Sequence, residues 1–251
     1  MTADFRNLAI RQLKDYRDNN PGTCFEDSNF ILDVNSAYKL QDTVTELRVS
    51  QGEEVIGYKV GCTGSGTLRQ FGMEGPIRGT IFANEILNNG AELDFSSFTN
   101  LAIEGEMAVR IGAKGEIASA FPIIELHNFV FRAPLKTLPE LIANNGLNAG
   151  IIRPDLSWQK STQYIEQSAQ LSVKINSKII ATGDLWPLPN GATDSVEWLK
   201  TNLKDWNHSL LSDHIVLTGT PLGLYPVHPG DRIAVSINEE EIVGCTVSTP
   251  H

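Results

Sequence analysis

Apolar residues recur every three or four positions over the first fifth of this 251-residue chain, the spacing of a helix with one apolar face. The spacing predicts one helix over residues 3–18, which the turn-forming residues 19–22 end, and a second helix over residues 34–49. These helices predict a small N-terminal helical cap over residues 1–53, followed by the main body over residues 54–251. We expect cap and body to form one structural unit.

Beyond residue 54 the apolar residues occur in short runs with a period of two, separated by glycine-rich turns. Helices are expected over residues 134–148 and 192–203. Many short strands with few helices between them favour an α+β fold with a mixed β-roll or barrel over a doubly wound parallel sheet. The expected strands are residues 55–61, 79–82, 101–111, 117–127, 170–175, 178–181, 214–220, 231–237 and 241–247.

Two glutamates, Glu104 and Glu106, lie within the predicted strand at 101–111. Because strand side chains alternate between faces, the two carboxylates point the same way. Like charges this close are costly to keep ionised unless a cation lies between them, and Mg²⁺ and Mn²⁺ prefer oxygen ligands. Taken alone, the pair also fits a solvated strand face in an acidic protein, which is the commoner explanation of such a motif.

A third carboxylate, Glu125, lies in an apolar run on the next predicted strand. An ionisable group in such surroundings needs a partner or a metal ion. If the strands pair antiparallel through the turn at residues 113–115, three carboxylates face one point and leave about half of an octahedral shell open to water and substrate. The alternative is a residue at the strand end that a Lys or Arg neutralises.

Lys59 lies between small and apolar residues of the strand at 55–61. An ammonium near apolar surface or a metal ion has a lowered pKa and can carry protons, whereas a lysine on an edge strand simply reaches to water. Thr218 and Thr220, in the turn at 218–223, offer hydroxyls and backbone N–H groups to a substrate carboxylate. An ordinary Gly/Pro turn is the alternative there.

The formal net charge of −10 argues against nucleic-acid binding, which needs basic patches. The N-terminus lacks the basic-then-apolar pattern of a secretory signal, and no apolar run reaches membrane-spanning length. The three cysteines are widely separated and suit a reducing compartment. We therefore expect a cytoplasmic protein with a small-molecule substrate and no nucleic-acid or membrane partner.

A set of short stretches spreads in order over most of residues 37–237. Together they resemble the hydratase and decarboxylase branch of the fumarylacetoacetate hydrolase superfamily. The ordered set is more specific than any one of its members. The stretches are residues 37–41, 57–61, 103–108, 122–125, 142–145, 216–219 and 226–231.

The resemblance implies that Glu104, Glu106 and Glu125 hold Mg²⁺ or Mn²⁺ and that Lys59 is the acid–base residue. It also implies a homo-oligomer and a short 2-oxo acid substrate, chelated by the metal through its carboxylate and 2-oxo oxygen. Hydration of a 2-hydroxy-dienoate, such as the enol of 2-oxopent-4-enoate, is the first expected function. Asn145, within a matching stretch, joins the candidates for substrate binding.

The polar residues around the predicted metal site depart from the pattern of this branch. Ile77, Asn128 and Asn144 stand where Asp is common, and Val130 stands where Arg is common. Arg78 instead adds a cation that suits a second carboxylate of the substrate. These departures keep a second function open, decarboxylation of a 2-oxo diacid of the oxalocrotonate type.

Two further functions stay open. The Thr-Gly-Thr-Pro sequence at residues 218–221 is common in hydrolases of the superfamily, so cleavage of an acylpyruvate C–C bond is possible, although no water-activating base is evident. The altered polar residues also fit a protein that binds a 2-oxo acid without catalysis, because a fold does not fix a function.

Overall fold

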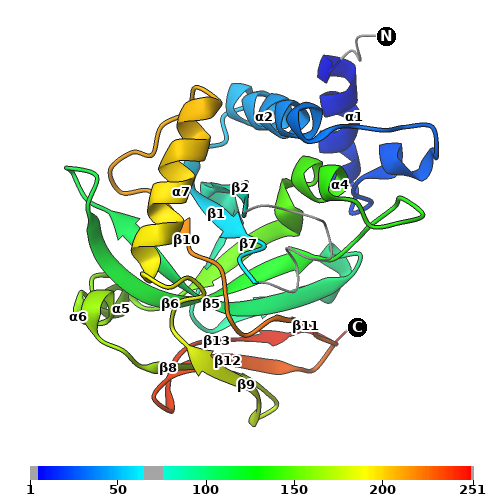
Figure 1. Ribbon diagram of the computed structural model, residues 1–251. Helices are drawn as coiled ribbons and strands as arrows, with labels where there is room; N and C mark the ends of the chain where they lie inside the picture. The colour runs from blue at the N-terminus through cyan, green and yellow to red at the C-terminus, as the bar shows by residue number, and fades with distance from the viewer. Residues whose placement is uncertain (1–4, 65–75, 250–251) are drawn as a thin grey trace.

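The computed structural model describes residues 5–64 and 76–249. Within these ranges the strands form two sheets, one of eight strands and one of five. The two sheets stack to form a roll, and helices cover the larger one (Figure 1). This arrangement confirms the expected α+β class and the mixed β-roll body. In the same ranges, no helix is both long and apolar enough to cross a membrane.

The helices of the described residues are α1 Phe5–Arg17, α2 Val34–Ser50, α4 Leu138–Ala143, α5 Leu156–Gln159, α6 Gln163–Glu166 and α7 Ala192–Asp205. The strands are β1 Val55–Gly61, β2 Ile77–Phe82, β3 Ile86–Asn88, β4 Ala91–Leu93, β5 Leu101–Ile111, β6 Ile117–Asn128, β7 Asn148–Arg153, β8 Gln170–Ile175, β9 Lys178–Asp184, β10 Ile215–Leu217, β11 Leu224–Pro226, β12 Arg232–Ile237 and β13 Glu240–Val247.

The large sheet has the strand order β2-β1-β10-β5-β6-β7-β3, with β11 pairing alongside β5. The small sheet has the order β4-β13-β12-β8-β9. In the large sheet β1 and β10 run parallel and β5 and β6 form a long antiparallel hairpin. Figure 1 shows the small sheet below this hairpin, while α1, α2 and α4 gather on its other side.

Most predicted elements are confirmed. The two cap helices are present as α1 and α2, although residues 3 and 4 of the first prediction lie outside the described residues. The strands predicted at residues 170–175 and 178–181 are present as β8 and β9 and form an antiparallel hairpin, with Asn176 and Ser177 both at positive φ in its turn. The division of the chain at residue 53 into cap and body stays a prediction.

The helix predicted over residues 134–148 is wrong for most of its length. Thr137 caps a helix of only six residues, α4, and Asn145, Gly146 and Leu147 then take positive φ angles of 56°, 61° and 62°. Three consecutive left-handed residues cannot continue a right-handed helix. The chain turns sharply there and enters β7, a strand that the apolar pattern did not predict.

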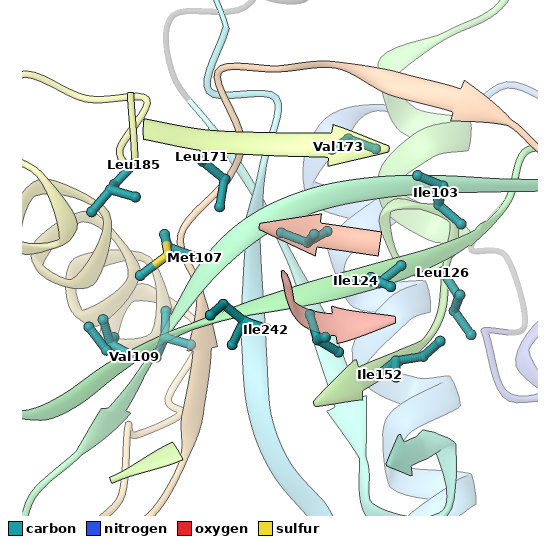
Figure 2. Packing of buried hydrophobic residues seen from close by; sticks show 14 of the residues in the cluster. Ile103, Met107, Val109, Ile124, Leu126, Ile152, Leu171, Val173, Leu185 and Ile242 are labelled. Atoms are coloured by element: carbon teal, nitrogen blue, oxygen red, sulfur yellow. The ribbon is translucent and has the colours of Figure 1, made fainter. Parts of the chain in front are cut away.

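The core lies between the two sheets and follows the alternation of β5 and β6. The odd-numbered residues of β5, among them Ile103, Met107 and Val109, point toward the small sheet and belong to one buried cluster with Val173 of β8 and Ile242 of β13 (Figure 2). The even-numbered residues of β5 therefore face the opposite side, toward the helices. Because both faces of the hairpin are covered, polar groups on the side of the even-numbered residues of β5 are withdrawn from water.

At Gly105 the small sheet approaches β5 so closely that there is no room for a side chain. A Cβ atom at this position would collide with Val173 Cγ2 and lie 2.9 Å from Val235 Cγ2. Since Gly105 separates Glu104 from Glu106, its missing side chain lets the two sheets close behind the strand that carries both carboxylates.

We predict that Gly105→Ala lowers the free energy of unfolding by about 1–3 kcal/mol, the usual cost of overpacking a core. Denaturant titration measures the loss. Val173→Ala removes the methyl groups in the way, so the double variant is expected to lose clearly less stability than the sum of the two single variants. Additive losses would show that this contact does not set the spacing of the sheets.

Candidate active site

The pairing of β5 with β6 brings the three predicted carboxylates together. Glu104 lies directly opposite Glu125 in the register of the two strands, and Glu106 lies two residues along on the same face. Glu106 and Glu125 are each 1% exposed, whereas the Glu104 side chain is partly exposed. The period-two argument from the sequence thus gives the arrangement that the structure has.

Lys59 reaches the same cluster from β1. Its ammonium lies 2.6 Å from Glu125 Oε1 and donates a hydrogen bond to the carbonyl oxygen of Gly146 at 3.2 Å. Three glycines surround the aliphatic part of the side chain. A Cβ at Gly79 would lie 2.9 Å from Lys59 Cγ, and one at Gly61 or Gly146 would lie 3.1 or 3.4 Å from Lys59 Cε. These glycines leave a narrow passage that fixes the path of the lysine.

Burial and charge act in opposite directions on Lys59. Burial favours the neutral amine, but the negative charges of Glu125 and Glu104 outweigh it and raise the pKa of Lys59 above its ordinary value. The expectation of a lowered pKa is therefore corrected for the protein without a bound cation. The ammonium is the counter-charge of the carboxylate cluster.

The two buried carboxylates respond differently to the same surroundings. For Glu106, burial raises the pKa well above its ordinary value, and the charges of Glu125 and Glu104 add to the effect. For Glu125, burial also favours the neutral acid, but the positive charges of His127 and Lys59 prevail and lower its pKa. Glu125 thus has partners for its charge, while Glu106 has none of its own.

Two residues that sequence analysis did not assign complete the cluster. Asn148, the first residue of β7, donates a hydrogen bond of 2.7 Å from Nδ2 to Glu125 Oε1. His127 places Nε2 3.2 Å from Glu125 Oε2 and 3.3 Å from Glu104 Oε2. The signal for His127 was present, since it follows Glu125 by two residues on a strand. Asn148 had no signal, because its segment was predicted to be helical.

A cavity of about 430 Å³ opens next to this cluster. Lys59, Glu104 and His127 lie at its polar part, and the rest of its wall includes Phe129, Phe131, Leu141 and Lys136. The volume lies in the range of small-molecule sites, which combine apolar walls with a few polar groups. The cavity therefore suits a small acid whose charged end meets the Glu–Lys–His cluster.

Arg78 does not share this cavity. It pairs with Val60 in the register of β1 and β2, one residue away from the position opposite Lys59, and so faces the other side of the sheet. Its fully buried guanidinium donates to both carboxylate oxygens of Asp42 and to Gln41. This placement corrects the expectation that Arg78 binds a substrate carboxylate.

The other three candidates for substrate binding use their side chains within the protein. The hydroxyls of Thr218 and Thr220 donate to the backbone carbonyls of Met107 and Gly105 at 2.8 and 2.7 Å. The Asn145 side chain exchanges two hydrogen bonds with the backbone of Thr80. Asn145 thereby fixes the turn whose next residue, Gly146, accepts a hydrogen bond from Lys59 through its carbonyl oxygen.

The cluster fits a divalent cation. Both carboxylate oxygens of Glu106 and Nε2 of His127 are buried and make no hydrogen bond within the described residues. One ligand atom each from Glu104, Glu125 and His127 lie within 4.8 Å of one another. Buried polar atoms without partners are costly, and a cation removes that cost for several of them at once.

No family model matches the chain. It is similar to 2-oxo-hept-4-ene-1,7-dioate hydratase of Escherichia coli, at 22% identity over 85% of this chain and 86% of the relative. It is also similar to the TodF product hydratase of Pseudomonas putida strain F1, at 29% identity over 82% and 81% of the two chains.

The fold is similar to that of 4-oxalocrotonate decarboxylase from Pseudomonas putida G7, solved in complex with magnesium and adipate. The TM-score is 0.86 at 19% sequence identity, over 98% of each chain. The relatives thus agree with the ordered stretches of the sequence and with the roll. The chain is thus similar in sequence to hydratases and in fold to a decarboxylase, in line with its resemblance to the hydratase and decarboxylase branch of the fumarylacetoacetate hydrolase superfamily.

Proposed function

We propose that the protein is a divalent-metal-dependent hydratase of a short 2-hydroxy-dienoate, such as the enol of 2-oxopent-4-enoate. The observation that carries this proposal is the Lys59 ammonium, held 2.6 Å from Glu125 beside a cavity that fits a small acid. The names of two relatives as hydratases of such compounds support it.

Glu104, Glu106 and Glu125 would hold the cation, Mg²⁺ or Mn²⁺. When bound, the cation supplies a positive charge that attracts the carboxylate and 2-oxo oxygen of the acid. Asn148 keeps Glu125 in place through its 2.7 Å hydrogen bond, so this ligand needs little rearrangement. The β5–β6 hairpin and the first residue of β7 thus define where the charged end of the substrate lies.

Lys59 moves the proton that converts the dienol to the enone. Its protonated Nζ gives a proton to C5 of the dienoate, and the proton of the 2-hydroxyl group returns to Nζ, so the lysine is unchanged overall. Water then adds across the C3–C4 double bond, with its oxygen bonding to C4 and a proton going to C3. The apolar wall of Phe129, Phe131 and Leu141 encloses the hydrocarbon end of the substrate during these steps.

A specific observation favours a diacid substrate and so keeps a second function open, decarboxylation of a 2-oxo diacid. Lys136 lies on the cavity wall, with Nζ 4.6 Å from the ring centroid of Phe129 and 5.1 Å from that of Phe131. Its ammonium suits a second carboxylate of the substrate, the role that the sequence had predicted for Arg78. Loss of CO₂ from the 2-oxo diacid would leave the same kind of enol that Lys59 can protonate.

We predict that Lys59→Met slows the ultraviolet decay of freshly made 2-hydroxypenta-2,4-dienoate in Mg²⁺ by about 10²–10⁴-fold, the usual contribution of a general acid or base. Thermal unfolding in Mg²⁺ checks that the variant is folded. Lys114→Met, at an exposed turn, is the control and should keep the wild-type rate. A rate within about tenfold of wild type would remove Lys59 from the proton transfer.

We predict that Glu106→Gln weakens Mg²⁺ binding at least about tenfold, because loss of even an outer partner of a metal ligand costs that much. The Mg²⁺ dependence of the melting temperature measures the affinity without turnover. Glu92→Gln, on an exposed strand position, is the matched control and should leave the apparent Mg²⁺ dissociation constant unchanged. An unchanged dissociation constant in Glu106→Gln would show that Glu106 is not a ligand.

We predict that Lys136→Met raises KM for 2-oxo diacids about tenfold and leaves KM for monoacids unchanged, since a charge-assisted hydrogen bond to the second carboxylate is lost. Initial rates of CO₂ release and of water addition measure the two reactions separately. Lys136→Arg keeps the cation and should largely restore diacid binding. Equal effects on diacids and monoacids would exclude recognition of a second carboxylate by Lys136.

A further inference from the structure

His127 lies within the carboxylate cluster, but the proton transfer proposed for Lys59 does not use it. It pairs with Ala102 across the hairpin and so points to the same face of β6 as Glu125. The residue is 4% exposed. A buried histidine on a strand face is usually held by a hydrogen bond from each ring nitrogen, so its partners decide what it does.

The Nε2 atom of His127 has no such bond. It is buried, lies 3.2 Å from Glu125 Oε2 and 3.3 Å from Glu104 Oε2, and yet satisfies the geometry of a hydrogen bond with neither. Glu125 already has Lys59 at 2.6 Å and Asn148 at 2.7 Å. The imidazole nitrogen therefore lies beside two carboxylates and has no hydrogen-bond partner of its own among the described residues.

We propose that His127 Nε2 is a direct ligand of the divalent cation, together with Glu104 and Glu125. One ligand atom of each residue lies within 4.8 Å of the other two, as neighbouring ligands of a single ion do. This inference deepens the proposed function and rests on it for the cation. It adds a nitrogen to the set of three carboxylates that the sequence indicated.

A nitrogen ligand changes which ion the site prefers. Mg²⁺ favours oxygen ligands only, whereas imidazole suits first-row ions such as Mn²⁺ and Fe²⁺. The site therefore binds Mn²⁺ more tightly than Mg²⁺, and His127 is the residue responsible for the difference. The alternative is a histidine that only contributes positive charge next to Glu125, and its removal would then leave the preference between Mg²⁺ and Mn²⁺ unchanged.

Pulsed electron paramagnetic resonance of the full chain loaded with Mn²⁺ tests the proposal without catalysis. The expected spectrum shows coupling of Mn²⁺ to a directly bound imidazole nitrogen. Protein grown with ¹⁵N-labelled histidine should show the ¹⁵N pattern instead, which separates the imidazole from the Lys59 amine. The labelling needs no substitution, so the test does not depend on a variant that folds.

Substitution then assigns the signal to one residue. His127→Val should abolish the nitrogen coupling and lower the ratio of Mg²⁺ to Mn²⁺ dissociation constants at least about tenfold. His208→Gln, a half-buried histidine beside Asp42, is the control and should change neither.

The outcomes separate this inference from the proposed function. Bound Mn²⁺ without histidine nitrogen coupling would overturn the ligand role of His127 while water addition could still be measured. Coupling in an enzyme that neither hydrates nor decarboxylates 2-oxo acids would uphold the ligand and overturn the proposed reaction. Failure of the wild-type protein to bind Mn²⁺ or Mg²⁺ at all would overturn both.

Discussion

The repulsion among Glu104, Glu106 and Glu125 is the constraint on which the rest of the site depends. Antiparallel pairing places Glu104 opposite Glu125, and covering of the hairpin withdraws Glu106 from water. Three carboxylates this close together destabilise the folded state unless cations or bound protons offset their repulsion. The Lys59 ammonium and the raised pKa of Glu106 are two responses to this constraint, and a bound metal ion would be the third.

The alternation of β5 separates stability from chemistry within one strand. Its odd-numbered residues, such as Met107 and Val109, form the centre of the core between the sheets, while its even-numbered residues carry the carboxylates. Gly105 belongs to the first set and lets the second sheet come close. Ligands held in this way move little, because moving them would disturb a packed core.

The sequence predicted those features that depend on local periodicity. The common face of Glu104 and Glu106 follows from a period of two, and the position of Glu125 needed only one antiparallel hairpin. Features set by register or by distant segments were not predictable. Arg78 and Gly79 are adjacent in the sequence, and only the register of β1 with β2 decides which of them lies opposite Lys59. Asn148 was missed because the apolar pattern does not reveal the three left-handed residues before it, which end the expected helix early and lead the chain into β7.

Under the proposed function, the choice between a monoacid and a diacid substrate is made away from the carboxylate cluster. Any 2-oxo acid presents the same carboxylate and neighbouring oxygen to the Glu–Lys–His cluster, so the cluster cannot tell a monoacid from a diacid. The far end of the proposed substrate would lie against the part of the cavity wall that includes Phe129, Phe131 and Lys136. The two aromatic rings favour a hydrocarbon end, and the lysine above them favours a second carboxylate. Under the proposed function, substrate selection is thus a competition between the two rings and the ammonium on a wall of the cavity that lies beyond the end of β6, outside the hairpin that holds the reactive groups.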